Sequence, residues 1–248
     1  MIIWITGASS GLGRELALRY AAAGHKVCVS ARNVDALEEL QKSNPGEEGG
    51  IYAFALDITD EVQVTEAFRS ICDEVGVPDL SILNAGTHQP NSAANFDSTV
   101  FRKIMDTNFM GVVNCLQEVV PEYLKQGGGK IAVVSSVAGY RGLPDASAYG
   151  ASKAALINMC EALAPELEVA GVSLCLVNPG FVKTPLTDLN EFPMPFLMEV
   201  EDAATQMISG LESDRFEITF PKRFTWLLKL LRIMPYALYF RLTRKLIK

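Results

Sequence analysis

Short apolar runs alternate with longer segments of helical periodicity along the first 220 residues. The apolar runs are typical of buried strands, and they occupy residues 2–6, 26–32, 51–59, 79–86, 130–136, 172–180 and 216–220. Strands separated by helices predict βαβ units with right-handed crossovers, and hence a parallel sheet covered on both faces. We therefore predict a doubly wound α/β fold with a seven-stranded parallel sheet in a single domain.

The helical segments lie between these strands. They cover residues 14–24, 33–43, 60–74 and 98–125, and a further one contains the sequence YGASK at 149–153. Pro165 predicts a kink or break in that last helix. No second domain or internal repeat is indicated, so we expect one domain, residues 1–220, followed by an extension, residues 221–248.

The composition favours a well-packed core and offers little for metal binding. Hydrophobic residues make up 49% of the 248 residues, and the mean hydropathy is +0.17. The five cysteines form no CxxC pair and only two histidines occur, His25 and His88, both expected in loops. No metal site or disulfide framework is therefore predicted. The N-terminus has no basic segment before its short apolar run, so a cytoplasmic protein is expected.

Charge is distributed unevenly along the chain. The net formal charge is −7, yet residues 221–248 contain eight lysines and arginines and no acidic residue. The first 220 residues therefore hold 14 basic and 29 acidic side chains. An acidic body argues against nucleic acid as a partner, because binding to the phosphate backbone needs a basic surface.

The sequence TGASSGLG, residues 6–13, joins the first predicted strand to the first predicted helix. Gly7 permits a tight turn, Gly11 lets the backbone approach a pyrophosphate, and Gly13 allows close helix–strand packing. Amides at the helix N-terminus then meet the phosphate charge. An ordinary strand–helix turn is the alternative. The position of the loop, as the first such connection in an alternating chain, favours a Rossmann-type dinucleotide site.

Tyr149 and Lys153 lie four positions apart in YGASK, with only small residues between them. On a helix this spacing sets both side chains on one face. A free phenol has a pKa of about 10, so it is a poor base at neutral pH, and a nearby ammonium is expected to lower that pKa. The pair alone is also common on protein surfaces.

Five motifs in order resemble the short-chain dehydrogenase/reductase family, in its single-domain branch. They are the glycine spacing TGxxxGxG, NAG at 84–86, a serine thirteen residues before Tyr149, the YxxxK pair and PG at 179–180. The resemblance covers residues 1–220. It implies an oxidoreductase that transfers hydride between nicotinamide and a carbonyl or secondary alcohol, and a homodimer or homotetramer.

The resemblance implies four catalytic residues. Tyr149 is expected to be the general acid/base, and Lys153 to hold the nicotinamide ribose and lower the pKa of Tyr149. Ser136 is expected to hydrogen-bond the substrate oxygen. Its neighbour Ser135 is the alternative, because successive strand residues point in opposite directions. Asn108 is expected to brace a water that links Lys153 to solvent.

Arg32 determines the expected cofactor. It follows the second strand, where a carboxylate would bind a free ribose 2′-hydroxyl. A guanidinium instead suits a 2′-phosphate. NADP(H) is therefore expected in preference to NAD(H), with Arg14 as a second cation nearby. A solvated surface charge is the alternative interpretation of Arg32.

The other expected cofactor contacts come from strand ends. Asp57 is expected to accept from the adenine amino group and Ile58 to cover the adenine ring. Asn84 is expected to brace the sheet centre, and Thr184 to contact the nicotinamide carboxamide. The full expected set is Gly7, Ser9, Ser10, Gly11, Leu12, Gly13, Arg32, Asp57, Ile58, Asn84, Ala85, Gly86, Tyr149, Lys153, Pro179, Gly180, Val182 and Thr184.

The expected substrate site is apolar. By resemblance, the segment after NPGFVKT covers the substrate, and here it is rich in phenylalanine, methionine and leucine. No cationic clamp for an acid is evident, so a lipophilic ketone, aldehyde or alcohol is expected. The expected substrate contacts are Ser136, Tyr140, Leu143, Tyr149, Phe181 and Phe192.

The basic extension, residues 221–248, has no charge-free run longer than eight residues, too short to span a bilayer. Bulky apolar and basic residues suit a pair of interfacial helices broken at Pro235, in peripheral contact with a membrane surface. Alternatively, the extension packs on the acidic body, roofs the substrate cleft or joins a partner subunit.

Two other functions fit part of the pattern. One is a cofactor-binding sensor or scaffold that the extension recruits to a membrane or partner. The other is epimerisation or dehydration on the same fold, which usually needs a larger C-terminal substrate region. The complete set of four catalytic residues favours the oxidoreductase.

Overall fold

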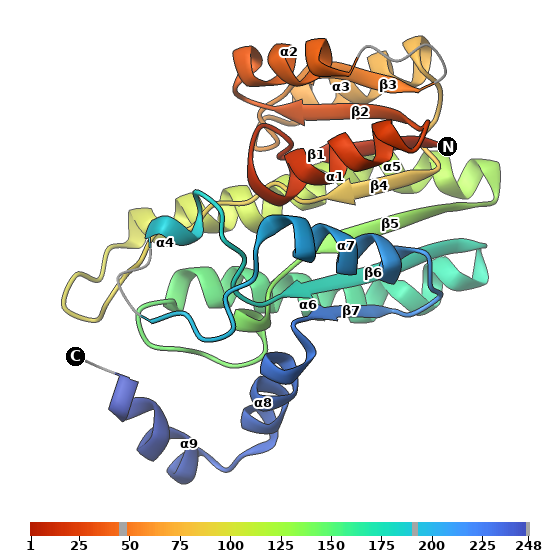
Figure 1. Cartoon of the computed structure of the whole chain (residues 1–248). Coiled ribbons are helices and arrows are strands. Elements are labelled where there is room, and N and C mark those ends of the chain that lie inside the picture. Colours follow the sequence, from red (N-terminus) through yellow and green to blue (C-terminus); the bar gives the residue numbers. More distant parts are fainter. Residues whose placement is uncertain (45–48, 190–192, 247–248) are drawn as a thin grey trace.

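The computed structural model describes residues 1–44, 49–189 and 193–246 (Figure 1). A single sheet holds the strands in the order β3-β2-β1-β4-β5-β6-β7, with every neighbouring pair parallel. The strands are β1 (Ile2–Thr6), β2 (Lys26–Ala31), β3 (Gly50–Ala55), β4 (Leu80–Leu83), β5 (Gly129–Val134), β6 (Val172–Pro179) and β7 (Glu217–Phe220). The predicted doubly wound, seven-stranded parallel sheet is confirmed.

Helices lie on both faces of this sheet. Their bounds are α1 (Gly11–Ala22), α2 (Val34–Ser43), α3 (Glu61–Glu74), α4 (Ser98–Met105), α5 (Gly111–Gln126), α6 (Ser147–Val169), α7 (Val200–Leu211), α8 (Lys222–Ile233) and α9 (Tyr236–Thr243). Helices α1, α2 and α7 cover one face, and α3, α5 and α6 cover the other (Figure 1). The two faces have separate apolar cores.

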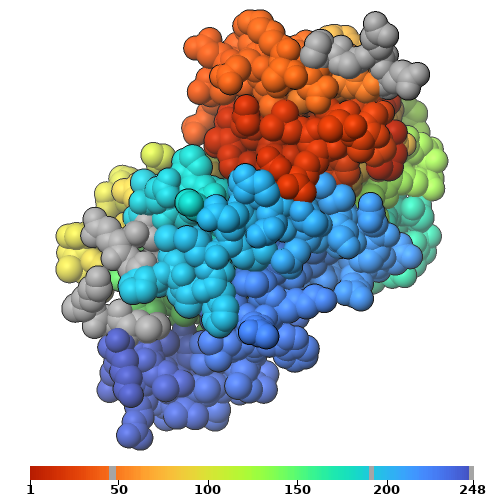
Figure 2. Space-filling view, viewed as in Figure 1, coloured from red at the N-terminus to blue at the C-terminus, as the bar shows by residue number. Residues whose placement is uncertain are grey.

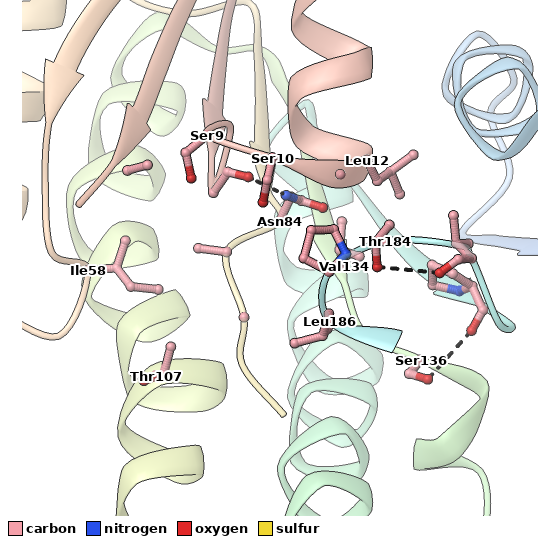
Figure 3. Close-up of a pocket in the computed structure, with 18 of the residues that line it drawn as sticks. Ser9, Ser10, Leu12, Ile58, Asn84, Thr107, Val134, Ser136, Thr184 and Leu186 are labelled. Atoms are coloured by element: carbon pink, nitrogen blue, oxygen red, sulfur yellow. Dashed lines mark hydrogen bonds between the residues drawn. The ribbon is translucent and has the colours of Figure 1, made fainter. Parts of the chain in front are cut away.

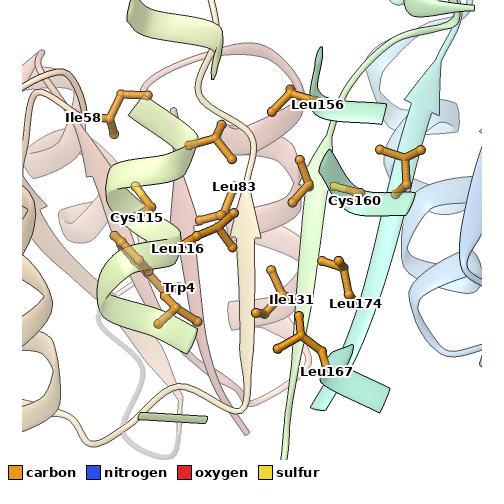
Figure 4. Packing of buried hydrophobic residues seen from close by; sticks show 14 of the residues in the cluster. Trp4, Ile58, Leu83, Cys115, Leu116, Ile131, Leu156, Cys160, Leu167 and Leu174 are labelled. Atoms are coloured by element: carbon orange, nitrogen blue, oxygen red, sulfur yellow. The ribbon is translucent and has the colours of Figure 1, made fainter. Parts of the chain in front are cut away.

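The core beneath α5 and α6 shows why the central strands are apolar throughout. Leu116 of α5 and Leu156 of α6 point at sheet residues such as Leu83 and Ile131, all of them buried (Figure 4). A sheet covered on both faces buries successive residues of each strand, so its strands lose the alternation of a half-exposed sheet. This packing fixes the carboxyl ends of the strands, where the loops begin.

The predicted helix over 98–125 differs from the structure. Helices α4 and α5 are joined by a π-helical segment, Asp106–Met110. A π-turn inserts one residue into an otherwise α-helical register and is common at functional sites. Of the kink or break predicted at Pro165, the break is wrong, because α6 continues through this residue.

Helices α8 and α9 follow β7 and lie beyond the β7 edge of the sheet (Figure 1). Pro235 stands at the N-cap of α9 and separates the two helices. Among the helices of the described residues, none is both long and apolar enough to cross a membrane.

Candidate active site

A cavity of about 440 Å³ lies at the carboxyl ends of the central strands (Figure 3). Parallel strands end at one edge of a sheet, so the loops that follow them converge there. The cavity is lined by every residue of the expected cofactor set except Gly13. It is also lined by Ser136, but Asn108 is buried behind it.

The glycines of this loop stand at positions that leave no room for a Cβ. Gly7 has φ of +70°, and a Cβ there would lie 2.6 Å from the Cα of Ala85. A Cβ on Gly13 would lie 2.5 Å from the carbonyl oxygen of Gly7, so this glycine lets α1 pack against the turn. Gly11 has φ of +55° and faces Thr184 across the cavity. The backbone of this loop is therefore exposed to the cavity at close range.

The N-terminus of α1 differs from those of the next three helices. Asn33, Asp60 and Asp97 each cap their own helix by accepting from backbone amides. Ser10 at the N-cap of α1 makes no such hydrogen bond. The first amides of α1 therefore face a cavity without an internal acceptor, which fits the pyrophosphate of a dinucleotide.

Arg32 and Asp57 lie together at one end of the cavity. The Arg32 Nη1 is 3.9 Å from the Asp57 Oδ2, and the guanidinium side chain is 69% exposed. Asp57 also accepts from the backbone and hydroxyl of Thr59, at 3.0 and 2.8 Å. The cavity thus offers both a cation and a carboxylate where the ribose end of a dinucleotide is expected.

Asn84 joins the β4 end to the glycine loop. Its Nδ2 donates to the carbonyl oxygens of Thr6 and Gly7, at 3.1 and 3.2 Å. Its backbone amide donates to the Thr6 hydroxyl at 3.1 Å. Asn84 therefore holds the two strand ends on either side of the cavity in register.

The two adjacent serines after β5 have different partners. Ser135 Oγ donates to the carbonyl oxygen of Lys153 at 2.8 Å and ties β5 to α6. Ser136 accepts from the Ala138 amide at 3.1 Å, and its hydroxyl lies within hydrogen-bond reach of the Tyr149 phenol. This geometry favours Ser136 over Ser135 as the serine beside the tyrosine.

Two features of the environment of Tyr149 shift its pKa in opposite directions. Burial raises the pKa of the phenol, and the hydrogen bond with Ser136 opposes that rise. The expectation of a lowered pKa is therefore wrong for the protein chain by itself, because desolvation disfavours the phenolate. The ring also packs edge-on against His88, with centroids 4.8 Å apart.

Lys153 is buried behind the tyrosine ring. Its Nζ lies 5.7 Å from the ring centroid and donates to the Val134 carbonyl oxygen at 2.9 Å. Burial lowers the pKa of Lys153 to about 8. The ammonium is thus held at one place, and its charge is lost at a pH that experiments can reach.

Asn108 occupies the π-helical segment and is fully buried. It accepts from the Thr87 amide at 2.7 Å and donates to the Thr87 carbonyl and the Ser152 hydroxyl, at 2.9 and 3.0 Å. The Asn108 Oδ1 and the Lys153 Nζ both lie beside Gly86, where a Cβ would be 3.4 and 3.5 Å from them. Asn108 therefore fixes the loop after β4 against α6.

The expected substrate residues are only partly brought together. Ser136 and Tyr149 line the cavity, whereas Tyr140, Leu143 and Phe181 do not. Tyr140 is buried under α8 with its hydroxyl bonded to Glu217. Substrate contact by Tyr140, Leu143 and Phe181 stays a prediction. Phe192 lies outside the described residues.

Several lining residues were not predicted from the sequence. They are Ser30, Ala31, Asn33, Leu56, Thr107, Val134, Pro185, Leu186 and Thr187. Most of them are next to a predicted residue in the sequence. Their position at the ends of the strands could therefore have identified them as lining residues. His88 was expected to be an ordinary loop residue, and its contact with Tyr149 was missed. In the described part of the chain, no cluster of three or more His, Cys, Asp or Glu side chains is arranged to hold a metal.

Residues 1–192 match the family described as short chain dehydrogenase. An uncharacterized oxidoreductase of Myxococcus xanthus is 36% identical over 98% of this chain and 96% of its own length. A 3-oxoacyl-[acyl-carrier-protein] reductase of Thermotoga maritima is 32% identical over 85% of this chain and 89% of its own.

Solved structures share the fold. A short chain dehydrogenase of Burkholderia cenocepacia, in complex with NADP, has a TM-score of 0.83 and 28% identity, covering 97% of this chain and 96% of that one. A Burkholderia phymatum structure with a TM-score of 0.84, at 24% identity, contains NAD instead. Both cofactors therefore occur among proteins of this fold.

Proposed function

The chain belongs to the short-chain dehydrogenase family, and from that premise we propose an NADP(H)-dependent oxidoreductase that interconverts a lipophilic carbonyl compound and a secondary alcohol. The observation that carries this proposal is the meeting of Ser136, Tyr149 and Lys153 in the same cavity as the uncapped N-terminus of α1. A nicotinamide dinucleotide bound there supplies or accepts the hydride.

The proton step falls to Tyr149. In carbonyl reduction its Oη gives a proton to the substrate oxygen, and in alcohol oxidation it takes one back. A phenol with a raised pKa stays protonated at neutral pH, which suits donation and therefore reduction. Ser136, on the same side as the phenol, holds the substrate oxygen.

Lys153 positions the site and supplies charge. Its bond to Val134 fixes the ammonium behind the Tyr149 ring. The positive charge stabilises the phenolate left after proton donation, an interaction that strengthens at low local dielectric. Asn108 is a positioning residue, because it holds the Thr87 loop against α6.

The cofactor preference rests on Arg32. Its exposed guanidinium can form charge-assisted hydrogen bonds with a ribose 2′-phosphate, which favours NADP(H). Asp57 at 3.9 Å partly offsets that charge. We therefore expect NADP(H) to bind more tightly than NAD(H), but not to the exclusion of NAD(H). Both nicotinamide dinucleotides need to be assayed.

The substrate class rests on the apolar surface at the nicotinamide end. Val134, Pro185 and Leu186 line this part of the cavity. The cover continues through Phe196 and Phe224, with ring centroids 5.9 Å apart. These contacts support a substrate with a lipophilic chain beside the reacting carbonyl.

Assembly and location are further parts of the proposal. The resemblance to the family supports a homodimer or homotetramer. The five cysteines are free thiols, and four of them are buried, in keeping with a cytoplasmic protein. The alternative function, a weakly active cofactor-binding sensor recruited through its tail, draws support only from the surface of α8 and α9.

The test is oxidation of NADPH by the purified protein with ketones and aldehydes of rising chain length, with NADH in parallel. Turnover that rises with chain length and prefers NADPH is the expected result. Tight NADPH binding without turnover of any carbonyl would favour the sensor. Turnover that persists in Tyr149→Phe would overturn the mechanism.

A further inference from the structure

Residues 222–246, here named the tail lobe, project from the rest of the molecule beside β7 (Figure 2). The lobe comprises α8, α9 and a final helical turn, Arg244–Leu246. One side of it packs on the body, and the other carries large apolar side chains into solvent. The two sides need separate explanations.

The inner side is well fixed. Phe224 and Leu228, one helical turn apart, are buried in the core beneath α6. Lys229 pairs with Glu217. Arg141 donates to the carbonyl oxygens of Leu231 and Met234 at the end of α8.

The same arginine also holds α9. The Arg141 guanidinium lies 4.0 Å from the ring centroid of Tyr239, which is buried. The Tyr239 hydroxyl donates to the Gly142 carbonyl. The lobe is therefore preformed on the body, as one of the sequence-based alternatives expected.

The outer side is apolar, and its large side chains are exposed. Trp226, Leu230 and Ile233 are spaced to share one face of α8, and they are 73%, 56% and 79% exposed. On α9, Tyr236 is 70% exposed and stacks on Phe240, which is 50% exposed. So many large exposed side chains on a short segment mark an interaction surface.

The charge around this face has one sign. The chain from 221 to 248 contains no acidic residue. Among the described cations of the lobe, Lys229 and Arg232 pair with the body. The other described cations make no salt bridge, and they are Lys222, Arg223, Arg241, Arg244 and Lys245. Arg223 is also one turn or less from Trp226 and Leu227. The free cations thus accompany the apolar outer side.

We propose that the outer side of the tail lobe docks on an anionic bilayer surface. Exposed tryptophan, tyrosine and leucine with surrounding arginine and lysine suit the headgroup boundary, where rings and aliphatic chains are buried and cations meet lipid phosphate. No described helix is both long and apolar enough to span the bilayer, so the lobe lies in the interface. A second copy of this chain would bring the same cations together, which disfavours it as the occupant.

Docking would also bring the apolar cover of the proposed substrate site close to the membrane. Phe224 of α8 contacts Phe181 and Phe196, with ring centroids 5.4 and 5.9 Å apart. A lipophilic substrate dissolved in the bilayer would then lie close to the cover. This consequence rests on the proposed function, whereas membrane binding itself does not and is measured without any substrate.

The two tryptophans make the binding experiment specific. Trp4 is fully buried, and its indole donates to Ser30, so only Trp226 can sense added vesicles. With the full-length protein, phosphatidylcholine vesicles containing phosphatidylglycerol should shift the emission to the blue, and high salt should reverse the shift. Trp226→Phe should abolish the shift but still sediment with the vesicles.

Variants of the outer side give the decisive comparison. Leu230→Gln combined with Ile233→Gln should reduce sedimentation with anionic vesicles at least tenfold, at an unchanged melting temperature and NADPH affinity. Val169→Gln on α6, where the side chain is 91% exposed, is the matched control and should bind like the parent. Arg223→Gln should weaken binding by about fivefold at low salt.

Three outcomes would overturn the proposal. One is failure of the parent protein to bind anionic vesicles. Another is equal binding to vesicles of phosphatidylcholine alone. The third is a parent protein that forms a dimer and does not bind vesicles, with the dimer dissociating in the double variant. That result would assign the outer side to contact with a second copy of the chain. None of these results depends on whether a carbonyl substrate is turned over.

Discussion

Two tyrosines nine positions apart along the chain lie beside ionisable side chains. Tyr149 faces the cavity next to Ser136, with the Lys153 ammonium behind its ring. Tyr140 lies beneath α8, with its hydroxyl donated to the Glu217 carboxylate. Burial raises the pKa of both phenols.

The difference lies in what each hydroxyl can still do. The Tyr140 hydroxyl is committed to a carboxylate that also accepts from Asn178 and Lys229, and the nearby negative charge raises its pKa further. The Tyr149 hydroxyl opens on a cavity and has a cation on its other side. A buried tyrosine therefore indicates chemistry only when its hydroxyl is accessible and its neighbours favour the phenolate.

The most direct test of this difference is to remove the hydroxyl from each tyrosine in turn. Tyr149→Phe is expected to lower kcat about a thousandfold, because general acid–base catalysis contributes about 10²- to 10⁴-fold. The melting temperature should change little, because the hydroxyl faces the cavity. Steady-state kinetics with NADPH and a turned-over ketone check this.

Tyr140→Phe is the matched control. It removes the same atom from the other tyrosine and should leave kcat within a few-fold of the parent. Instead it should lower stability by about 1 kcal/mol, because a buried hydrogen bond to a carboxylate is lost. If Tyr140→Phe abolished turnover as well, the two sites would be one functional unit.

The Lys153 ammonium beside Tyr149 provides a second test, because its charge depends on pH. Lys153 is protonated below its pKa of about 8, so kcat/KM for carbonyl reduction should be constant below that pH and fall as the pH rises through it. Lys153→Met should lower the plateau about a hundredfold and remove the break. The pH–rate profile of both proteins is the measurement.

The His88 imidazole is also an ionisable neighbour of Tyr149, with its ring centroid 4.8 Å from that of the phenol ring. His88→Asn should leave the break near pH 8 in place. A break in the parent between pH 6 and 7 that disappears in His88→Asn would assign the profile to the histidine and contradict the role given to Lys153.

At the far end of the cavity, the pair of Arg32 and Asp57 tests the cofactor preference. Arg32→Ala should weaken NADPH binding by about 10- to 100-fold, the usual effect of losing a hydrogen bond to a charged group, and leave NADH binding unchanged. Arg14→Ala is the comparison, because that side chain pairs loosely with Glu39. Equal losses for NADPH and NADH in Arg32→Ala would refute phosphate selection by this residue.

The sequence was sufficient to predict the sheet and to predict which strand-end residues meet around one cavity. Apolar runs that are buried on both faces leave a clear pattern, and seven of them predicted the seven strands. The glycines at 7, 11 and 13 are required by backbone geometry that only glycine tolerates at close range, so their spacing carries structural information by itself.

Three of the expected substrate residues, Tyr140, Leu143 and Phe181, lie outside the lining of the cavity for a physical reason. Tyr140 and Phe181 follow motif residues closely, but the tail packs over them, and such a long-range contact leaves no periodic signal in either segment. The π-helical segment around Asn108 was missed because it adds one residue without changing the apolar pattern on either side. Local pattern and motif spacing therefore predict what backbone geometry fixes, and they fail where distant segments meet.

The last expected effect is on stability alone and concerns the carboxylate beside Tyr140. Burial acts to raise the pKa of Glu217, but hydrogen bonds from Lys229, Tyr140 and Asn178 outweigh it and lower the pKa. A carboxylate with a lowered folded-state pKa contributes stability above its unfolded value of about 4.3, and loses it as the pH falls through the folded-state pKa. Glu217→Gln should therefore lower the free energy of unfolding by about 1 to 2 kcal/mol at pH 7.

Urea denaturation at pH 7 and at progressively lower pH measures this difference, which should shrink as the parent carboxylate is protonated. Glu161→Gln is the matched control, because Glu161 meets Arg232 only at 3.9 Å with both side chains about half exposed. Exposed pairs of this kind contribute about 0 to 1 kcal/mol. If the two variants were equally stable, Glu217 would not fix α8 to the body, and Tyr140 would lose the partner that distinguishes it from Tyr149.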